Sequence, residues 1–160
     1  MTVALSELPA QPMLSIRATI PVAKLGDTMG ERIGALSRFL HERGMQPAGP
    51  PFVRYHTFTD TDTDMEFGVP VTEALAGDGQ IAAGELPEGP AVTTWHVGAP
   101  ERLGEAYERI EKWRVEHGRE PAGPAREVYH WIDLSAPEED SASPVDPSKW
   151  RIELVQPLSH

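Results

Sequence analysis

The chain contains one segment twice, and this duplication restricts the possible folds more than any other feature of the sequence. Residues 44–56 read GMQPAGPPFVRYH, and residues 118–130 read GREPAGPAREVYH. The tetrapeptide PAGP and the pair Tyr-His therefore recur at a constant spacing of 74 residues. A repeat of this kind predicts two similar supersecondary units that share one core.

The correspondence continues on both sides of this segment. Upstream, a helical pattern recurs at the same spacing, so that Ile33 corresponds to Tyr107. Downstream, Glu66 corresponds to Glu153 at a spacing of 87 residues, which places an insertion of 13 residues in the second copy. The insertion falls within residues 134–148, which are rich in Pro, Ser, Asp and Glu and are expected to form an exposed loop.

Each copy has the pattern of a strand, a helix and two further strands. Apolar runs and alternations predict strands at residues 14–22, 52–58, 65–71, 81–86, 91–97, 126–132 and 150–155. A first helix is expected to begin at the capping box of Thr28 and end at Gly44, and a second to begin near Pro100 and end at Gly118. We therefore expect an α+β fold, a duplicated βαββ unit. Two helices would pack on one side of a largely antiparallel, curved sheet, with a ligand cleft at the pseudo-two-fold axis.

These elements predict one domain with four parts. Residues 1–12 are expected to be a loose N-terminal tail, and residues 13–73 the first βαββ repeat. Residues 74–90 are expected to be a linker with a short strand, and residues 91–160 the second repeat. A chain of 160 residues is long enough for both repeats to share one core.

The charge balance and the absence of cysteine exclude several kinds of protein. The chain has 14 basic and 25 acidic residues and a formal net charge of −11, whereas direct binding to nucleic acid requires a basic face. No cysteine is present, so a disulfide framework or a thiolate metal site is not possible. The sequence shows neither a targeting signal nor an apolar run of about 20 residues, the length that crosses a membrane. We expect a cytoplasmic protein that contacts neither nucleic acid nor membrane.

No metal or cofactor site is expected. Asp60, Asp62 and Asp64 resemble the opening of a calcium-binding loop. Such a loop needs Gly at its sixth position and Glu at its twelfth, where this chain has Met65 and Val71. We interpret the three aspartates as part of a solvated hairpin turn.

Candidate ligand-binding residues follow from the alternation of side chains along the predicted strands. We expect the apolar residues Val128 and Ile152 to face the helices, which leaves Glu127, Tyr129 and Glu153 together on the face away from the helices. The duplication adds equivalent positions of the first copy. The candidate ligand-binding residues are therefore Glu127, Tyr129, Trp131, Glu153, Tyr55, Glu66, Trp95 and Tyr107.

Aromatic rings combined with carboxylates favour one kind of ligand. A planar organic cation can stack on Tyr and Trp rings, and each good cation–π contact contributes about 0.5–2 kcal/mol. A partly buried carboxylate complements the charge of such a ligand. An open sheet that exposes Glu127 and Glu153 to solvent explains the same pattern equally well, and Tyr107 at helical spacing also fits a core position.

Three stretches match the motifs of a known family. They are ELPEGPAVTTWHVG at residues 85–98, PAREVYHWID at residues 124–133 and DPSKWRIELVQPL at residues 146–158. In their order and spacing they resemble the GyrI-like small-molecule-binding family, which includes the effector-binding domains of multidrug-sensing transcription regulators of the MerR and AraC types. The resemblance implies a tandem βαββ fold and covers the chain from about Leu14.

The resemblance also implies roles for individual residues. The motif E-[VI]-Y assigns the pocket carboxylate to Glu127 and its ring to Tyr129, and W-R-x-E assigns the acidic residue of the final strand to Glu153. The aromatic residue that often follows H-x-G-P in the family is replaced here by Glu101. Val155 stands where a further aromatic residue can occur.

Two functions of different classes are consistent with this resemblance. The first is a stand-alone protein that binds lipophilic, often cationic, small molecules for sequestration or effector sensing, and we expect no segment for a DNA-binding head. The alternative is a hydrolase of strained electrophiles such as cyclopropane-bearing genotoxins, with Glu127 as general base and Glu153 or Tyr129 holding the water. A protein-interaction module with an exposed apolar patch and no pocket is a third hypothesis. The residues do not identify the natural ligand, the oligomeric state or a protein partner.

Overall fold

The computed structural model of the protein describes residues 3–74, 76–98, 102–132, 134 and 150–159. In this part of the chain two α-helices pack on one antiparallel sheet. The strands are β1 (Val3–Leu8), β2 (Gln11–Pro21), β3 (Phe52–Phe58), β4 (Asp62–Pro70), β5 (Ala82–Leu86), β6 (Gly89–Val97), β7 (Arg126–Tyr129) and β8 (Arg151–Pro157). The helices are α1 (Leu25–Glu42), which follows the 3-10 turn η1 (Val22–Lys24), and α2 (Gly104–Glu116).

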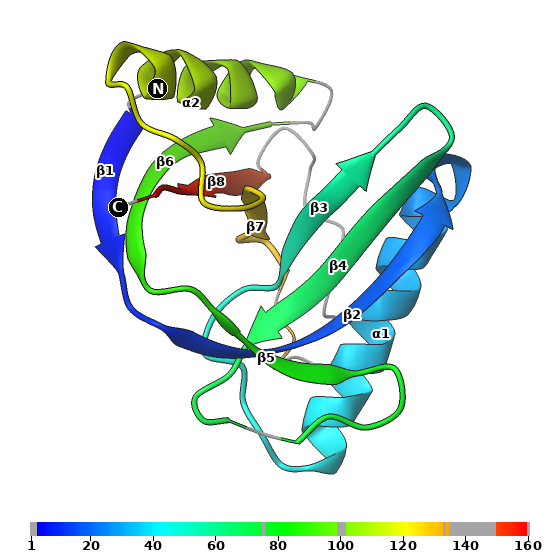
Figure 1. Ribbon diagram of the computed structural model, residues 1–160. Coiled ribbons are helices and arrows are strands. Elements are labelled where there is room, and N and C mark those ends of the chain that lie inside the picture. The colour runs from blue at the N-terminus through cyan, green and yellow to red at the C-terminus, as the bar shows by residue number, and fades with distance from the viewer. Residues whose placement is uncertain (1–2, 75, 99–101, 133, 135–149, 160) are drawn as a thin grey trace.

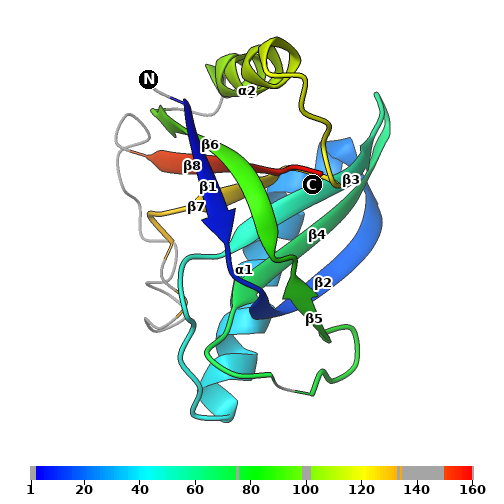
Figure 2. The same ribbon diagram turned by 60° about the vertical axis from the view of Figure 1, so that its left-hand side comes forward.

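The sheet is curled, and both helices lie on its outer side. Its strand order is β1-β6-β8-β7-β3-β4-β2-β5. Figure 1 shows α2 over β6 and α1 beside β2 and β4, both outside the curl, and Figure 2 shows the same arrangement after rotation. We call the face that carries the helices the outer face and the opposite face the inner face. The predicted α+β fold with two helices on one side of an antiparallel, curved sheet is confirmed.

The two copies are related by a pseudo-two-fold axis in the centre of the sheet. β3 and β7 pair so that Val53 lies opposite Glu127, and these two residues occupy the same position of the duplicated segment. The axis therefore passes through this pair. The two PAGP segments are also equivalent in the structure, since each forms one isolated bridge to the end of its copy, Pro47 to Val71 and Pro121 to Leu158.

The N-terminal segment is a strand, so the predicted loose tail is wrong. β1 pairs with β6 and β2 pairs with β5 in one register, and residues 3–15 run antiparallel to residues 82–94. The sequence Glu-Leu-Pro at residues 7–9 recurs at residues 85–87, a second repeated signal that the strand prediction missed. Each copy is therefore ββαββ, and its first strand pairs with the second strand of the other copy.

The two helices end in the same way but do not begin as predicted. α1 begins at Leu25, and Thr28 is buried inside the helix rather than capping it. Gly44 and Gly118 follow the two helices with φ of 62° and 61°, a left-handed conformation that favours glycine. Pro100 and most of the loop predicted at residues 134–148 lie outside the described residues.

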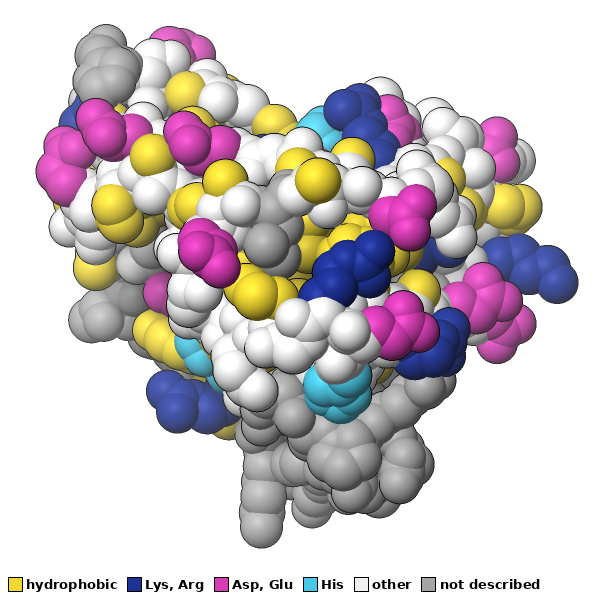
Figure 3. Space-filling model, turned by 90° about the horizontal axis from the view of Figure 1, so that it is seen from below, with side chains coloured by type: hydrophobic (Ala, Val, Ile, Leu, Met, Phe, Trp, Pro, Cys, Tyr) yellow, Lys and Arg dark blue, Asp and Glu magenta, His cyan; other side chains and the backbone are white. Residues whose placement is uncertain are grey.

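Buried apolar side chains form separate groups on the two faces. The largest group lies under α1 and includes Leu14, Ile16, Leu36, Leu40, Val53 and Phe67, and a second lies under α2 and includes Val92, Ala106, Ile110, Leu154 and Leu158. On the inner face Met13, Phe52 and Leu86 pack with Val128. Seen from below, acidic and basic side chains occur among apolar ones (Figure 3). In the described part of the chain neither helix is long and apolar enough to cross a membrane.

Candidate functional site

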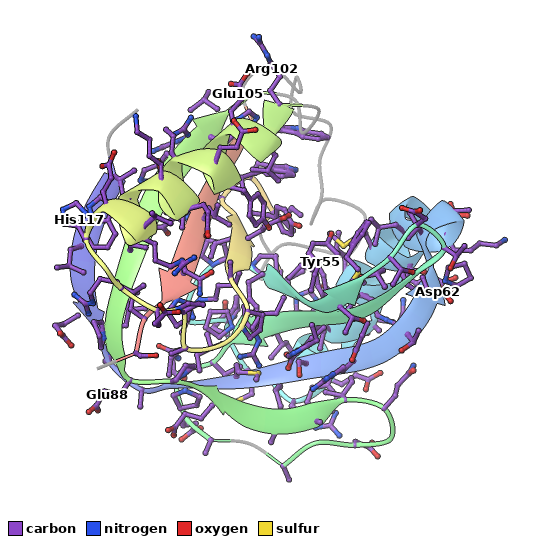
Figure 4. The ribbon with its side chains drawn as sticks, turned by 45° about the horizontal axis from the view of Figure 1, so that its top comes forward. Tyr55, Asp62, Glu88, Arg102, Glu105 and His117 are labelled. Atoms are coloured by element: carbon purple, nitrogen blue, oxygen red, sulfur yellow. The ribbon has the colours of Figure 1, made fainter. Side chains whose placement is uncertain are left out.

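A cleft of about 820 Å³ lies on the outer face between the two helices. α1 packs mainly on β2 and β4, and α2 packs mainly on β1, β6 and β8, so the cleft lies between the helices over β3 and β7. In Figure 4 the labelled Tyr55 of β3 lies in this region between α1 and α2. The cleft is lined by Leu25, Gly26, Met29, Gly30, Ile33, Tyr55, Phe58, Leu103, Tyr107, Glu127, Tyr129, Trp131, Ile132, Trp150 and Ile152. Its size and its largely apolar lining are typical of small-molecule sites.

Glu127 supplies the carboxylate of the cleft. It lies on β7 at the pseudo-two-fold axis and is only 6% exposed. The Tyr107 hydroxyl of α2 donates a hydrogen bond to Oε2, and the Tyr129 hydroxyl donates one to Oε1 at 2.7 Å. Burial raises the pKa of Glu127, although the two tyrosine hydrogen bonds oppose this effect. The carboxyl group therefore holds its proton to a higher pH than an exposed glutamate does.

Three tyrosine hydroxyls surround this carboxylate. The pKa of Tyr55, of Tyr107 and of Tyr129 is raised, first by burial and then by the negative charge of Glu127. All three phenols consequently remain protonated at neutral pH. They can donate hydrogen bonds to an anionic oxygen, but they cannot neutralise the charge of Glu127.

Aromatic rings form the wall beside Glu127. The rings of Trp131 and Trp150 are stacked, with centroids 4.6 Å apart and planes at 2°. The ring of Tyr129 meets Trp131 edge-on at 5.3 Å. The sequence prediction missed Trp150 as a site residue, although this tryptophan belongs to the W-R-x-E motif and lies immediately before β8.

The α1 side of the cleft was also missed. Met29 and Ile33 have the spacing of core residues on an amphipathic helix, so the pattern alone favours a core position for both. In the structure both residues line the cleft, together with Gly26 and Gly30. The signal available in the sequence was the spacing of these two glycines by about one helical turn, because glycine is unfavourable inside a helix.

The predicted site residues separate into two groups. Glu127, Tyr129, Trp131, Tyr55 and Tyr107 line the cleft. Glu153, Glu66 and Trp95 do not.

The face predicted for Glu127 is wrong. In the β7–β8 ladder Glu127 lies opposite Leu154 and Val128 lies opposite Glu153. Residues directly opposite each other project to the same face, so Glu127 lies on the helix side with Tyr129 and Leu154. Glu153 lies on the inner face, where it was expected. The cleft therefore contains one carboxylate among the described residues instead of the predicted group.

The other two glutamates form equivalent pairs with histidine on the inner face. Glu66 Oε1 lies 2.9 Å from His56 Nε2 and accepts a hydrogen bond from Arg54 Nε at 2.9 Å. Glu153 Oε1 lies 3.2 Å from His130 Nε2. The first pair connects β3 to β4, and the second connects the residue after β7 to β8, so both have a structural role.

Trp95 belongs to the same face as the second pair. Its ring lies 4.6 Å from the ring of His130, and the Arg151 guanidinium lies 4.6 Å from its centroid. Among the described residues no cluster of acidic or histidine side chains is arranged to hold a metal ion.

A duplicated α+β sheet with an aromatic cleft at its pseudo-two-fold axis defines the class of small-molecule-binding domains. Residues 1–158 match the family described as GyrI-like small molecule binding domain, and the chain belongs to this family. No curated protein matches the sequence.

Solved structures similar to the chain include two of EcmrR. In a complex with DNA, EcmrR has a TM-score of 0.79 and 22% identity, and the match covers 99% of this chain and 57% of that chain. The chain thus spans little more than half of the length of EcmrR. The C-terminal domain of EcmrR has a TM-score of 0.76 and 25% identity over 99% of this chain and 97% of that chain.

Two more distant structures share the fold. A hydrolase from Listeria innocua has a TM-score of 0.65 and 12% identity, over 98% of this chain and 91% of that chain. SAV2435 bound to tetraphenylphosphonium has a TM-score of 0.63 and 14% identity, over 99% of this chain and 94% of that chain.

Proposed function

We propose that the cleft binds lipophilic organic cations and that Glu127 supplies the complementary negative charge. The observation that carries this proposal is a buried carboxylate with two tyrosine donors and, among the described residues, no basic partner. An ionised carboxylate without a counter-charge is costly to bury. A ligand cation would provide that counter-charge, and the stacked Trp131 and Trp150 would add apolar and cation–π contacts.

The similar structures support this proposal without testing it. SAV2435 has been solved with tetraphenylphosphonium, which is a lipophilic cation. The part of EcmrR that resembles this chain is its C-terminal domain, and EcmrR has been solved in a complex with DNA. We extend the binding of a lipophilic cation from SAV2435 to this protein. We further propose that this binding serves effector sensing or sequestration.

Titration with tetraphenylphosphonium tests the proposal. Trp131 and Trp150 line the cleft, so tryptophan fluorescence reports binding. We expect Glu127→Gln to weaken binding by about 10- to 100-fold, because the cation loses the one charged partner that the described residues of the cleft provide. Equal affinity of the wild type and Glu127→Gln would contradict the proposal.

Two controls separate the charge from other effects of substitution. Glu153→Gln removes a glutamate from the inner face and should leave the affinity unchanged. Triphenylphosphine oxide is neutral, so its binding should not change in Glu127→Gln. A loss of cation binding in Glu153→Gln as large as in Glu127→Gln would show that the effect does not depend on the cleft.

The second candidate function is the hydrolysis of strained electrophiles. It is favoured by the raised pKa of Glu127, because burial makes this carboxyl group a better general acid than an exposed glutamate. A hydrolase from Listeria innocua has the same fold. Turnover of a reactive cyclopropane substrate that is lost in Glu127→Gln supports this function, whereas stoichiometric protection of the substrate contradicts it.

A further inference from the structure

The two sides of the cleft differ in chemistry although the duplication makes them equivalent. Tyr107 of α2 occupies the position of Ile33 of α1. Tyr107 donates a hydrogen bond to Glu127, whereas Ile33 contributes only apolar surface. Of the two helices, α2 therefore supplies the polar side of the cleft, and α1 supplies the apolar side.

Two glycines of α1 lie on this apolar side. Gly26 and Gly30 are one turn apart and both line the cleft. A Cβ placed on either glycine meets no atom within 4 Å. Neither residue has the positive φ that would favour glycine. Neither packing nor backbone conformation therefore explains these two glycines.

The glycines lower the stability of α1. Glycine inside a helix costs about 0.5–1 kcal/mol relative to alanine, because its backbone loses more freedom on folding. The space that a side chain would occupy belongs to the cleft. The effect of Gly26 and Gly30 on the site is thus to leave the α1 backbone bare and the cleft wide.

We infer that Gly26 and Gly30 set the upper size limit of the ligand. The cationic group of the ligand lies next to Glu127 and Tyr107, and its apolar bulk packs on the bare surface of α1. This inference rests on the proposed function, because it assumes a cationic ligand in the cleft. It adds the orientation of the ligand in the cleft, and it proposes that α1 selects ligands by their size.

Gly30→Leu tests the inference with two cations of different size. Tetraphenylphosphonium is bulky, whereas trimethylphenylammonium carries one ring. We expect Gly30→Leu to weaken tetraphenylphosphonium binding at least about tenfold, because a side chain placed in a filled cleft causes overpacking. Binding of trimethylphenylammonium should not change. Gly30→Ala should show a smaller effect in the same direction, and it keeps a strong helix former at this position.

Gly104→Leu is the matched control. Gly104 is also helical, and a Cβ there also meets no atom within 4 Å, but Gly104 does not line the cleft. Thermal unfolding should show that Gly30→Ala and Gly30→Leu are at least as stable as the wild type. Gly104→Leu should bind both cations as the wild type does.

The possible outcomes distinguish the inference from the proposed function. Unchanged tetraphenylphosphonium affinity in Gly30→Ala and Gly30→Leu overturns the size limit, even if Glu127→Gln abolishes binding. Equal loss of both cations in Gly30→Leu also overturns it, because a size limit spares the smaller one. If the wild type binds neither cation, the proposed function fails and the inference fails with it.

Discussion

Two buried glutamates, Glu66 and Glu127, have opposite pKa shifts although they lie on the strands on either side of β3. Burial raises the pKa of both. At Glu66 the hydrogen bonds from Ser15 and His56 and the charge of Arg54 outweigh burial, so its pKa is lowered overall. In the described part of the chain the donors to Glu127 are two neutral tyrosines, so burial dominates. Glu66 is therefore a permanent structural anion, whereas Glu127 can change its protonation when its surroundings change.

The raised pKa of Glu127 predicts that cation binding depends on pH. A bound cation favours the ionised carboxylate and lowers its pKa, so binding releases up to about one proton when the empty site is protonated. The affinity for tetraphenylphosphonium should fall as the pH decreases through the raised pKa. Calorimetry in buffers of different ionisation enthalpy measures the released protons. Glu127→Gln should show no such release, and the same release in that variant would assign the proton to another group.

At the scale of elements, local signals in the sequence predicted the structure well. PAGP marked the ends of both helices, since proline excludes further helical residues and Gly44 and Gly118 adopt positive φ. Apolar spacing identified both helices. The alternation of side chains grouped Glu127 correctly with Tyr129.

Properties that depend on pairing between distant strands were not predicted. Alternation shows which residues of one strand share a face, but it does not show which residue of the next strand lies opposite. Glu127 was grouped with Glu153, whereas the register places Glu127 opposite Leu154. β1 was missed for the same reason: its pairing partner β6 belongs to the other copy, and the pattern within residues 3–8 does not reveal that partner. Only the repeated Glu-Leu-Pro could have indicated that residues 3–8 form a strand.

β1 is predicted to stabilise the second copy rather than the first. It covers the edge of β6, and Val3 packs on the apolar group under α2. Deletion of residues 1–8 should lower the free energy of unfolding by about 2 kcal/mol, on the scale of burying one or two aliphatic side chains. Denaturant unfolding measures the loss, and hydrogen exchange should show faster exchange in β6.

Leu5→Ser is the control for this deletion. Leu5 is 54% exposed, so its replacement should change the free energy of unfolding by less than about 0.5 kcal/mol. Unchanged stability and unchanged exchange after the deletion would mean that β1 contributes nothing to the fold.

At the scale of the whole molecule, duplication and divergence have separate effects. Duplication produces the frame, since equivalent strands pair around the axis through Val53 and Glu127. Divergence at a few positions produces the site. Val53 is buried in the core, whereas Glu127 faces the cleft. A symmetric frame thus contains an asymmetric cleft, in which Glu127 is the one charged residue among those that the structure describes.

This arrangement predicts that neither copy can bind a cation alone. Gly30 and Tyr55 come from the first copy, whereas Tyr107 and Glu127 come from the second. The ladders β1–β6, β2–β5 and β3–β7 all join the two copies. A protease site inserted in the turn at residues 78–80 allows the folded chain to be cut between them. The cut protein should remain associated and bind tetraphenylphosphonium, because all of these ladders persist.

Separation of the cut halves in denaturant completes the test. Each refolded half should fail to bind, since it lacks half of the cleft and exposes strands that normally pair with the other copy. Mixing the halves should restore binding, with a dependence on the concentration of both. Binding of wild-type affinity by the second half alone would show that Glu127 and Tyr107 need no opposite wall, and the shared cleft would then not be the binding site.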